Sequence, residues 1–125
     1  MLIGEYMISF RRAIELLDDY GFAETITYQE ERRAGKQIIV KADVVLVDGS
    51  RLIIREYIGS KYGLEKLSYA YQYQDSSGSL IFRYDNAAHK PALISRNHRH
   101  DENGEIIITD PPEIQSLVDE VVRYL

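Results

Sequence analysis

The segment from Leu67 to His89, LSYAYQYQDSSGSLIFRYDNAAH, constrains the fold more than any other part of the chain. Between Leu67 and Gln74 large and small or polar side chains alternate strictly, a period of two that predicts a β-strand with one aromatic face. The sequence DSSG at residues 75–78 is typical of a turn, and a second alternating run follows it. The segment therefore predicts a β-hairpin whose two strands share that face. The residues expected on it are Leu67, Tyr69, Tyr71, Tyr73, Leu80, Phe82 and Tyr84.

The opposite face of this hairpin is polar. An Arg and an Asp in the middle of a sheet are hard to explain by packing, because charged groups lose hydration when they are covered. Their position therefore indicates a functional cluster. The residues expected on this face or directly after it are Ser68, Gln72, Arg83, Asp85, Asn86 and His89.

The same segment carries a resemblance to a known family. The pattern YxYxxQD at residues 69–75, followed by GxLIFRYDNAxH at residues 78–89, resembles the TumE family. The sequence REY at residues 55–57 and the pair His98-x-His100 also match family positions, so the resemblance covers roughly residues 40–100. It implies a small cytoplasmic toxin that is neutralised by a helix-turn-helix antitoxin encoded beside it. It also implies ribonuclease activity as an expectation.

Composition narrows the class of protein. A chain of 125 residues with 45% hydrophobic and 28% charged residues fits one globular domain, residues 1–125. It has no cysteine, which excludes disulfides and thiolate-ligated metals. Charged residues interrupt the apolar pattern of the N-terminus, so we expect neither a signal peptide nor a membrane span, and a cytoplasmic protein.

Charge is distributed unevenly along the chain. The net charge of −5 argues against a general nucleic-acid coat. However, residues 83–100 have a balance of +3 and contain all three histidines, whereas residues 101–125 have a balance of −6. An anionic substrate is therefore expected to bind near the basic window.

A second hairpin is expected around Asp48-Gly49, because a two-residue turn of the primed type favours this dipeptide. Pairing of Val47 with Ser50 would place Lys41 opposite Glu56, and Asp43 opposite Ile54, on one sheet face. The other face would be apolar apart from two arginines near the strand edges. It is expected to carry Val40, Ala42, Val44, Leu46, Ile53 and Tyr57, with Arg51 and Arg55.

The rest of the chain predicts two helices and short strands. Apolar residues at three- and four-residue steps predict a helix from about Glu5 to Tyr20, stopped by Gly21. A second helix is expected after Asp110 as N-cap, with an apolar stripe from Ile114 to Leu125. Further expected elements are a strand at 25–28, a charged hairpin tip at 30–35, a long loop from 90 to 104 and a strand at 105–109.

These elements predict an α+β fold: an antiparallel meander sheet of about five to six strands, with the N- and C-terminal helices packed on one face. No helix separates the middle strands, so a parallel doubly wound sheet is not expected. The other sheet face is left exposed.

The candidate site supplies the parts of a metal-independent ribonuclease. Such cleavage needs a base, an acid and a cation on the phosphate. Arg83 would hold the phosphate, and His89 with His98 or His100 would move protons. Glu56 and Asp85 would position the imidazoles, or Glu56 would be the base, and no cofactor is expected. The residues expected to bind substrate are Lys41, Gln72, Asn86, Arg96 and Arg99.

Several alternatives remain open at this point. The protein could be a non-catalytic interaction module whose exposed sheet face and Glu/Arg clusters bind a protein partner. Arg83 and Asp85 could also simply form surface ion pairs with Glu56 and Lys41. It could be a metal-dependent nuclease with Asp43, Glu56 and the histidines as ligands, or His98-x-His100 could bind zinc with His89 or Asp101. His89 could simply fix the turn, and the tyrosines could stack on bases or fill the core. The hydrophobic strands could also pair in a homodimer.

Overall fold

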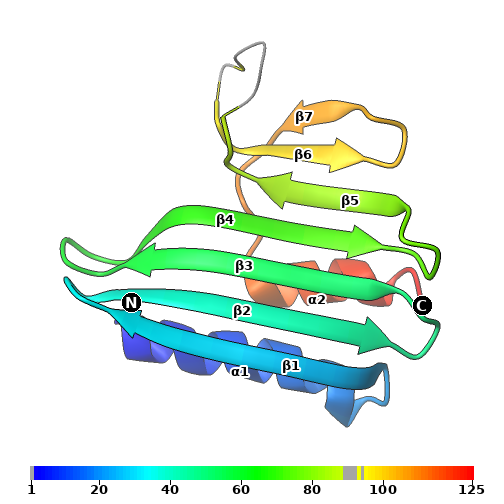
Figure 1. The fold of residues 1–125 in the computed structure, drawn as a ribbon, viewed down its shortest axis with the longest axis horizontal. Helices are drawn as coiled ribbons and strands as arrows, with labels where there is room; N and C mark the ends of the chain where they lie inside the picture. The colour runs from blue at the N-terminus through cyan, green and yellow to red at the C-terminus, as the bar shows by residue number, and fades with distance from the viewer. Residues whose placement is uncertain (1, 89–92, 94) are drawn as a thin grey trace.

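The computed structural model describes residues 2–88, 93 and 95–125. It has two helices and a seven-stranded antiparallel sheet with the strands in sequence order, which confirms the predicted α+β meander with one or two strands more than expected (Figure 1). None of the helices among these residues is long and apolar enough to cross a membrane. The elements are α1 (Ile3–Asp19), β1 (Ala23–Arg33), β2 (Gln37–Leu46), β3 (Arg51–Gly59), β4 (Glu65–Gln74), β5 (Leu80–Asp85), β6 (His98–Asp101), β7 (Ile106–Ile108) and α2 (Ile114–Val122).

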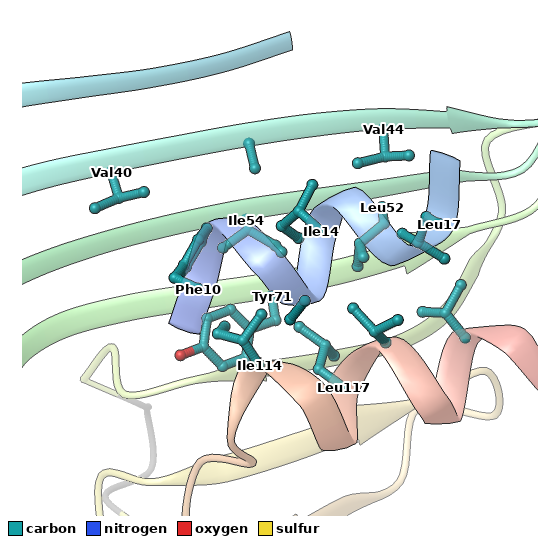
Figure 2. Close-up of a cluster of buried hydrophobic side chains, with 14 of the residues drawn as sticks. Phe10, Ile14, Leu17, Val40, Val44, Leu52, Ile54, Tyr71, Ile114 and Leu117 are labelled. Carbon is teal, nitrogen blue, oxygen red and sulfur yellow. The ribbon is translucent and has the colours of Figure 1, made fainter. Parts of the chain in front are cut away.

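Both helices pack on the same face of the sheet, as predicted (Figure 1). The apolar stripe of α1 includes Phe10 and Leu17, and that of α2 includes Leu117. These side chains meet the alternate residues of the central strands that point toward the helices, such as Val44 and Ile54 (Figure 2). One hydrophobic core therefore lies between the helices and the sheet, and the other sheet face is uncovered by helices.

The two strands of the tyrosine hairpin share the predicted face, with a shift of register between Tyr73 and Gln74. Tyr73 lies opposite Phe82 and Tyr71 opposite Tyr84 on the helix-covered face. Tyr69, Tyr71 and Tyr73 are buried, so the interpretation of these tyrosines as core residues is confirmed. Because side chains alternate between faces, Arg83 and Asp85 belong to the open face, as predicted.

The predicted register of the β2–β3 hairpin is wrong by one residue. Val45 pairs with Arg51, and the backbone of Leu46 bonds to both Gly49 and Ser50, so the loop has three residues instead of two. Gly49 has the positive φ of +84°, while Asp48 accepts hydrogen bonds from Ser50. A shift of one residue exchanges the two faces of a strand.

Because the faces of β3 are exchanged, several of its residues lie on the opposite side of the sheet from the one predicted. Leu52, Ile54 and Ile58 fill the core, and Glu56 points to the same side. Lys41 lies opposite Arg55, and Asp43 opposite Ile53. The open face of the β2–β3 hairpin carries Lys41, Asp43, Arg51, Ile53, Arg55 and Tyr57.

Three further expectations are corrected. The loop expected at 90–104 contains strand β6, which pairs with β5 on one side and β7 on the other. Strand β1 runs through the charged residues Glu30 to Arg33, because these pair with β2, and only residues 34–36 form the turn. Helix α2 begins after Glu113 without a side-chain cap, so Asp110 is not its N-cap.

The three-residue loop at Gly49 predicts a graded effect of alanine. Gly49 and Gly104 both have positive φ, but a Cβ at Gly49 would lie 3.0 Å from the Ser76 Cβ, whereas one at Gly104 would meet nothing within 4 Å. Gly104→Ala is expected to lower the free energy of unfolding by about 1–2 kcal/mol, the cost of the left-handed conformation. Gly49→Ala should lower it further. Urea denaturation measures both, and equal losses would contradict the packing against Ser76.

Candidate functional site

The open face of the sheet is hollowed into a groove of about 480 Å³. Its walls come from strands β2 to β5 and from the segment after β5. The charged residues that line it are four basic residues, Asp85, and Glu56, whose side chain is buried. The ionisable side chains that the open face and the adjoining segment present to the groove are Lys41, Arg55, Arg83, Asp85 and Arg96.

Arg83 and Asp85 form an ion pair within the groove. The Arg83 Nε atom donates to Asp85 Oδ2 at 2.8 Å, and its Nη1 atom donates to Gln72 Oε1 at 2.7 Å. Gln72 lies directly opposite Arg83 across the β4–β5 pair. The guanidinium is thereby held by two fixed acceptors, while 37% of its side chain remains exposed. It can still contact an anion in the groove.

Strand β6 brings two imidazoles to the same place. His98 pairs with Asp85, and His100 pairs with Arg83, so both histidines lie on the open face. His98 Nε2 lies 3.1 Å from Asp85 Oδ1, and His100 Nε2 lies 4.0 Å from Asp85 Oδ2. The two imidazole rings meet edge to face with centroids 4.8 Å apart. The predicted association of Arg83 and Asp85 with His98 and His100 is therefore observed.

The two histidines differ in exposure. The His98 side chain is 2% exposed, and its Nδ1 atom lies 2.6 Å from the carbonyl oxygen of Arg96. The His100 side chain is 26% exposed. His98 is thus suited to hold its neighbours in place, and His100 is the histidine that a substrate could reach.

Asp85 is ionised at neutral pH despite its burial. Burial acts to raise the pKa of Asp85, but hydrogen bonds from Arg83 and the Ala87 amide, and the charge of His98, outweigh it and lower the pKa. Both ring nitrogens of His98 face acceptors, namely this carboxylate and a carbonyl oxygen. The His98 ring is therefore held from both sides.

Asn86 has a structural contact that sequence reasoning did not anticipate. Its Oδ1 atom accepts a hydrogen bond from the Tyr69 amide, and its Nδ2 atom donates to the Leu67 carbonyl. Tyr69 in turn donates from its hydroxyl to Asn97. Asn86 therefore continues the β4–β5 pairing beyond the last residue of β5, although it also lines the groove.

Arg99, expected to bind substrate, lies on the helix-covered face. It donates to Glu120 of α2 at 2.8 Å, and its guanidinium lies over the rings of Phe82 and Tyr84. Tyr84 also donates to Glu120. Because Arg99 alternates with the two histidines along β6, it must point away from them, and it attaches α2 to the sheet.

Glu56, predicted beside Arg83, also lies on the helix-covered face. Its carboxylate accepts hydrogen bonds from the hydroxyls of Tyr6 and Tyr71 and pairs with Lys66 Nζ at 3.3 Å. Burial and the nearby Glu56 charge raise the pKa values of Tyr6 and Tyr71. The prediction that Glu56 acts in the same site as Arg83 is wrong, because the hairpin register exchanges its face.

The remaining candidates are distributed as follows. Asp43 pairs with Arg51, so it does not join the histidines as a ligand. Asp101 accepts the amides of Asn103 and Glu105 in the β6–β7 turn. His89 lies outside the described residues. Arg55 was missed as a groove residue because the wrong register placed it on the apolar face, and a three-residue loop ending in Gly49 was the signal that could have found it.

Comparison with known proteins adds a family. The model of a family described as Toxin TumE matches residues 13–125 of the chain. This match covers all strands of the sheet and the candidate catalytic and substrate-binding residues. Neither the curated proteins nor the solved structures gave a match to the chain.

The buried cluster around Glu56 predicts a stability effect. Tyr71→Phe removes one donor from a buried carboxylate, so the free energy of unfolding should fall by about 1–3 kcal/mol. The control is Tyr62→Phe, because Tyr62 is 91% exposed and its change should stay within about 0.5 kcal/mol. Urea denaturation measures both variants. Equal stability of the two variants would show that the hydroxyl of Tyr71 contributes nothing to Glu56.

Alkaline pH is expected to destabilise the protein through Tyr69. Burial, with the charges of Asp85 and Asp110, raises the pKa of Tyr69 from 10.0 to about 12. A pKa raised in the folded state gives stability that is complete below pH 10 and is lost as pH rises toward 12. Denaturation between these pH values should show this decline, and Tyr69→Phe should make it shallower. A decline of the same steepness in Tyr69→Phe would contradict the prediction.

Proposed function

Because the chain belongs to the TumE toxin family, we propose that it is a toxin that cleaves RNA in the groove of its open sheet face. The observation that carries this proposal is an Arg83–Asp85 pair that lines a groove with further cations and has two histidines beside it on the neighbouring strand. A groove lined with cations can bind a polyanion such as RNA. The guanidinium, the carboxylate and the two imidazoles are groups that can bind a phosphodiester and transfer protons during its cleavage.

Binding is assigned to the basic residues of the groove. Lys41, Arg55 and Arg96 come from three separate segments of the chain, yet all line the same hollow. They would contact successive phosphates of a single strand, while Arg83 holds the phosphate to be cleaved. The overall charge of −5 does not oppose this, because local positive charge is what guides an anion.

Proton transfer is assigned to His100. Its partly exposed ring lies next to the Asp85 carboxylate, which can hold the imidazole in one orientation. Buried His98 positions that carboxylate, and Arg83 offsets the charge that develops on phosphorus. Neither the proton transfer nor the stabilisation of charge on phosphorus requires a metal ion. His89 stays a prediction as the second proton carrier, outside the described residues.

Membership of a toxin family implies an antitoxin partner. That this antitoxin is a helix-turn-helix protein stays a prediction, as does a homodimer formed through the sheet edges. A non-catalytic toxin that acts only by binding a protein is the competing function. It differs in one observable property, because it would not degrade RNA when purified.

The test combines toxicity in cells with RNA cleavage by purified protein in the presence of a chelator. Arg83→Ala and His100→Ala should each lower the cleavage rate by about 10²-fold or more, since each removes a group from the transition state. Toxicity should be lost in parallel. The control is Arg51→Ala, which alters an arginine of the same sheet face that pairs with Asp43 and does not line the groove.

Two results would contradict the proposed function. One is full toxicity of Arg83→Ala at equal expression. The other is an Arg51→Ala variant that loses cleavage as much as Arg83→Ala, which would indicate that any cation on the face suffices. Cleavage should also weaken as salt rises, because the substrate is held through its phosphates.

A further inference from the structure

We propose that Asp85, His98 and His100 form a binding site for a divalent transition-metal ion, for which Zn²⁺ is the probe. One potential ligand atom from each residue lies within 4.8 Å of the other two. The histidines are two residues apart on β6, and the aspartate is on the neighbouring strand β5. Two strands of a hydrogen-bonded sheet thus present three ligands from a rigid base.

The distances suit a small ion after a slight adjustment. Zinc takes nitrogen and oxygen ligands at about 2.0–2.2 Å, so tetrahedral ligand atoms lie about 3.4 Å apart. The His98 Nε2–Asp85 Oδ1 distance is 3.1 Å, and the His100 Nε2–Asp85 Oδ2 distance is 4.0 Å. The first pair is already at this separation. A rotation of the more exposed His100 ring would bring the third ligand into range.

The surroundings of the ligands resemble those of metal sites. His98 points its Nδ1 atom at the Arg96 carbonyl, which fixes the ring so that Nε2 faces Asp85. A histidine ligand held from behind by a carbonyl oxygen is the usual arrangement. Asp85 is likewise held, by the Ala87 amide at 3.0 Å and by Arg83. These contacts hold two of the three ligands in place before any ion binds.

Charge and ligand type select the ion. His98 Nε2 and Asp85 Oδ1 face each other 3.1 Å apart, and a divalent cation would bind to both atoms. Metal binding would require His98 Nε2 to carry no proton. Two imidazoles and one carboxylate favour Zn²⁺ and similar ions, whereas Mg²⁺ prefers oxygen ligands alone. This ligand set differs from the predicted ones, which combined the histidines with Asp43 and Glu56, or with His89 or Asp101.

Binding of a metal ion does not rest on RNA cleavage, but the two share atoms. A metal ion on His100 Nε2 would take the nitrogen assigned to proton transfer. Zn²⁺ is therefore expected to inhibit the proposed cleavage, and a chelator to restore it. If Zn²⁺ instead accelerates cleavage, the metal-free mechanism is wrong while the metal site is supported.

The direct test is calorimetric titration of the purified full chain with Zn²⁺, without RNA. One ion per chain should bind, and His100→Ala and Asp85→Asn should each weaken binding at least about tenfold. Asp43→Asn is the control, because Asp43 is a carboxylate of the same face with its own arginine partner. Mg²⁺ in excess should not compete.

Folding of each variant is checked by circular dichroism. His100→Ala is the main variant, since His100 is the most exposed of the three and its loss should disturb the fold least. Unchanged Zn²⁺ affinity in folded His100→Ala, or no saturable binding by the parent chain, would overturn the proposal. If only Asp43→Asn lost Zn²⁺ binding, the ion would bind at Asp43, and the proposed site would be wrong.

Discussion

The interaction on which the site depends is the burial of the Asp85 carboxylate among cationic and amide donors. Asp85 is 4% exposed and lies at the end of β5, where the chain leaves the sheet. A buried charge without partners is strongly destabilising, and removing one partner of a buried pair costs about 3–5 kcal/mol. Arg83, the Ala87 amide and His98 supply those partners. The carboxylate therefore joins β5, β6 and the segment after β5 into one arrangement.

A second buried carboxylate shows how different partners give different roles. Glu56 is satisfied by the hydroxyls of two tyrosines and by Lys66, which come from α1 and β4. Its cluster stabilises the side of the sheet that the helices cover. Asp85 is satisfied by groups that border a groove, and these groups can exchange a protein contact for a substrate or an ion. The helix-covered face thus carries the carboxylate that stabilises the fold, and the open face carries the carboxylate of the proposed site.

Features that follow from the alternation of side chains within a strand could be predicted from the sequence. Features that depend on how strands pair could not. The tyrosine hairpin was placed correctly because its period of two fixes the faces of Arg83 and Asp85 whatever the exact loop. Glu56 and Arg55 were placed wrongly because one loop residue exchanges the faces of the whole strand. Strand β6 was missed because its residues, HRHD, have little intrinsic strand preference and gain it from neighbours on both sides. The apolar stripe of α2 was predicted correctly up to Val121, but Leu125 is exposed beyond the helix end, and the start of the helix was predicted wrongly.

The pairing of β6 with β5 makes both the proposed RNA cleavage and the proposed metal binding possible. In a loop, His98 and His100 would have no fixed relation to Asp85, whereas in a strand they must share its face and lie within reach of it. A carboxylate held in that position needs positive charge beside it. Arg83 supplies such a charge in the structure, and a divalent ion bound between Asp85 and the imidazoles would add to it. The proposed proton transfer and the proposed metal binding would therefore use the same His100 nitrogen, and the concentration of free metal would decide between them.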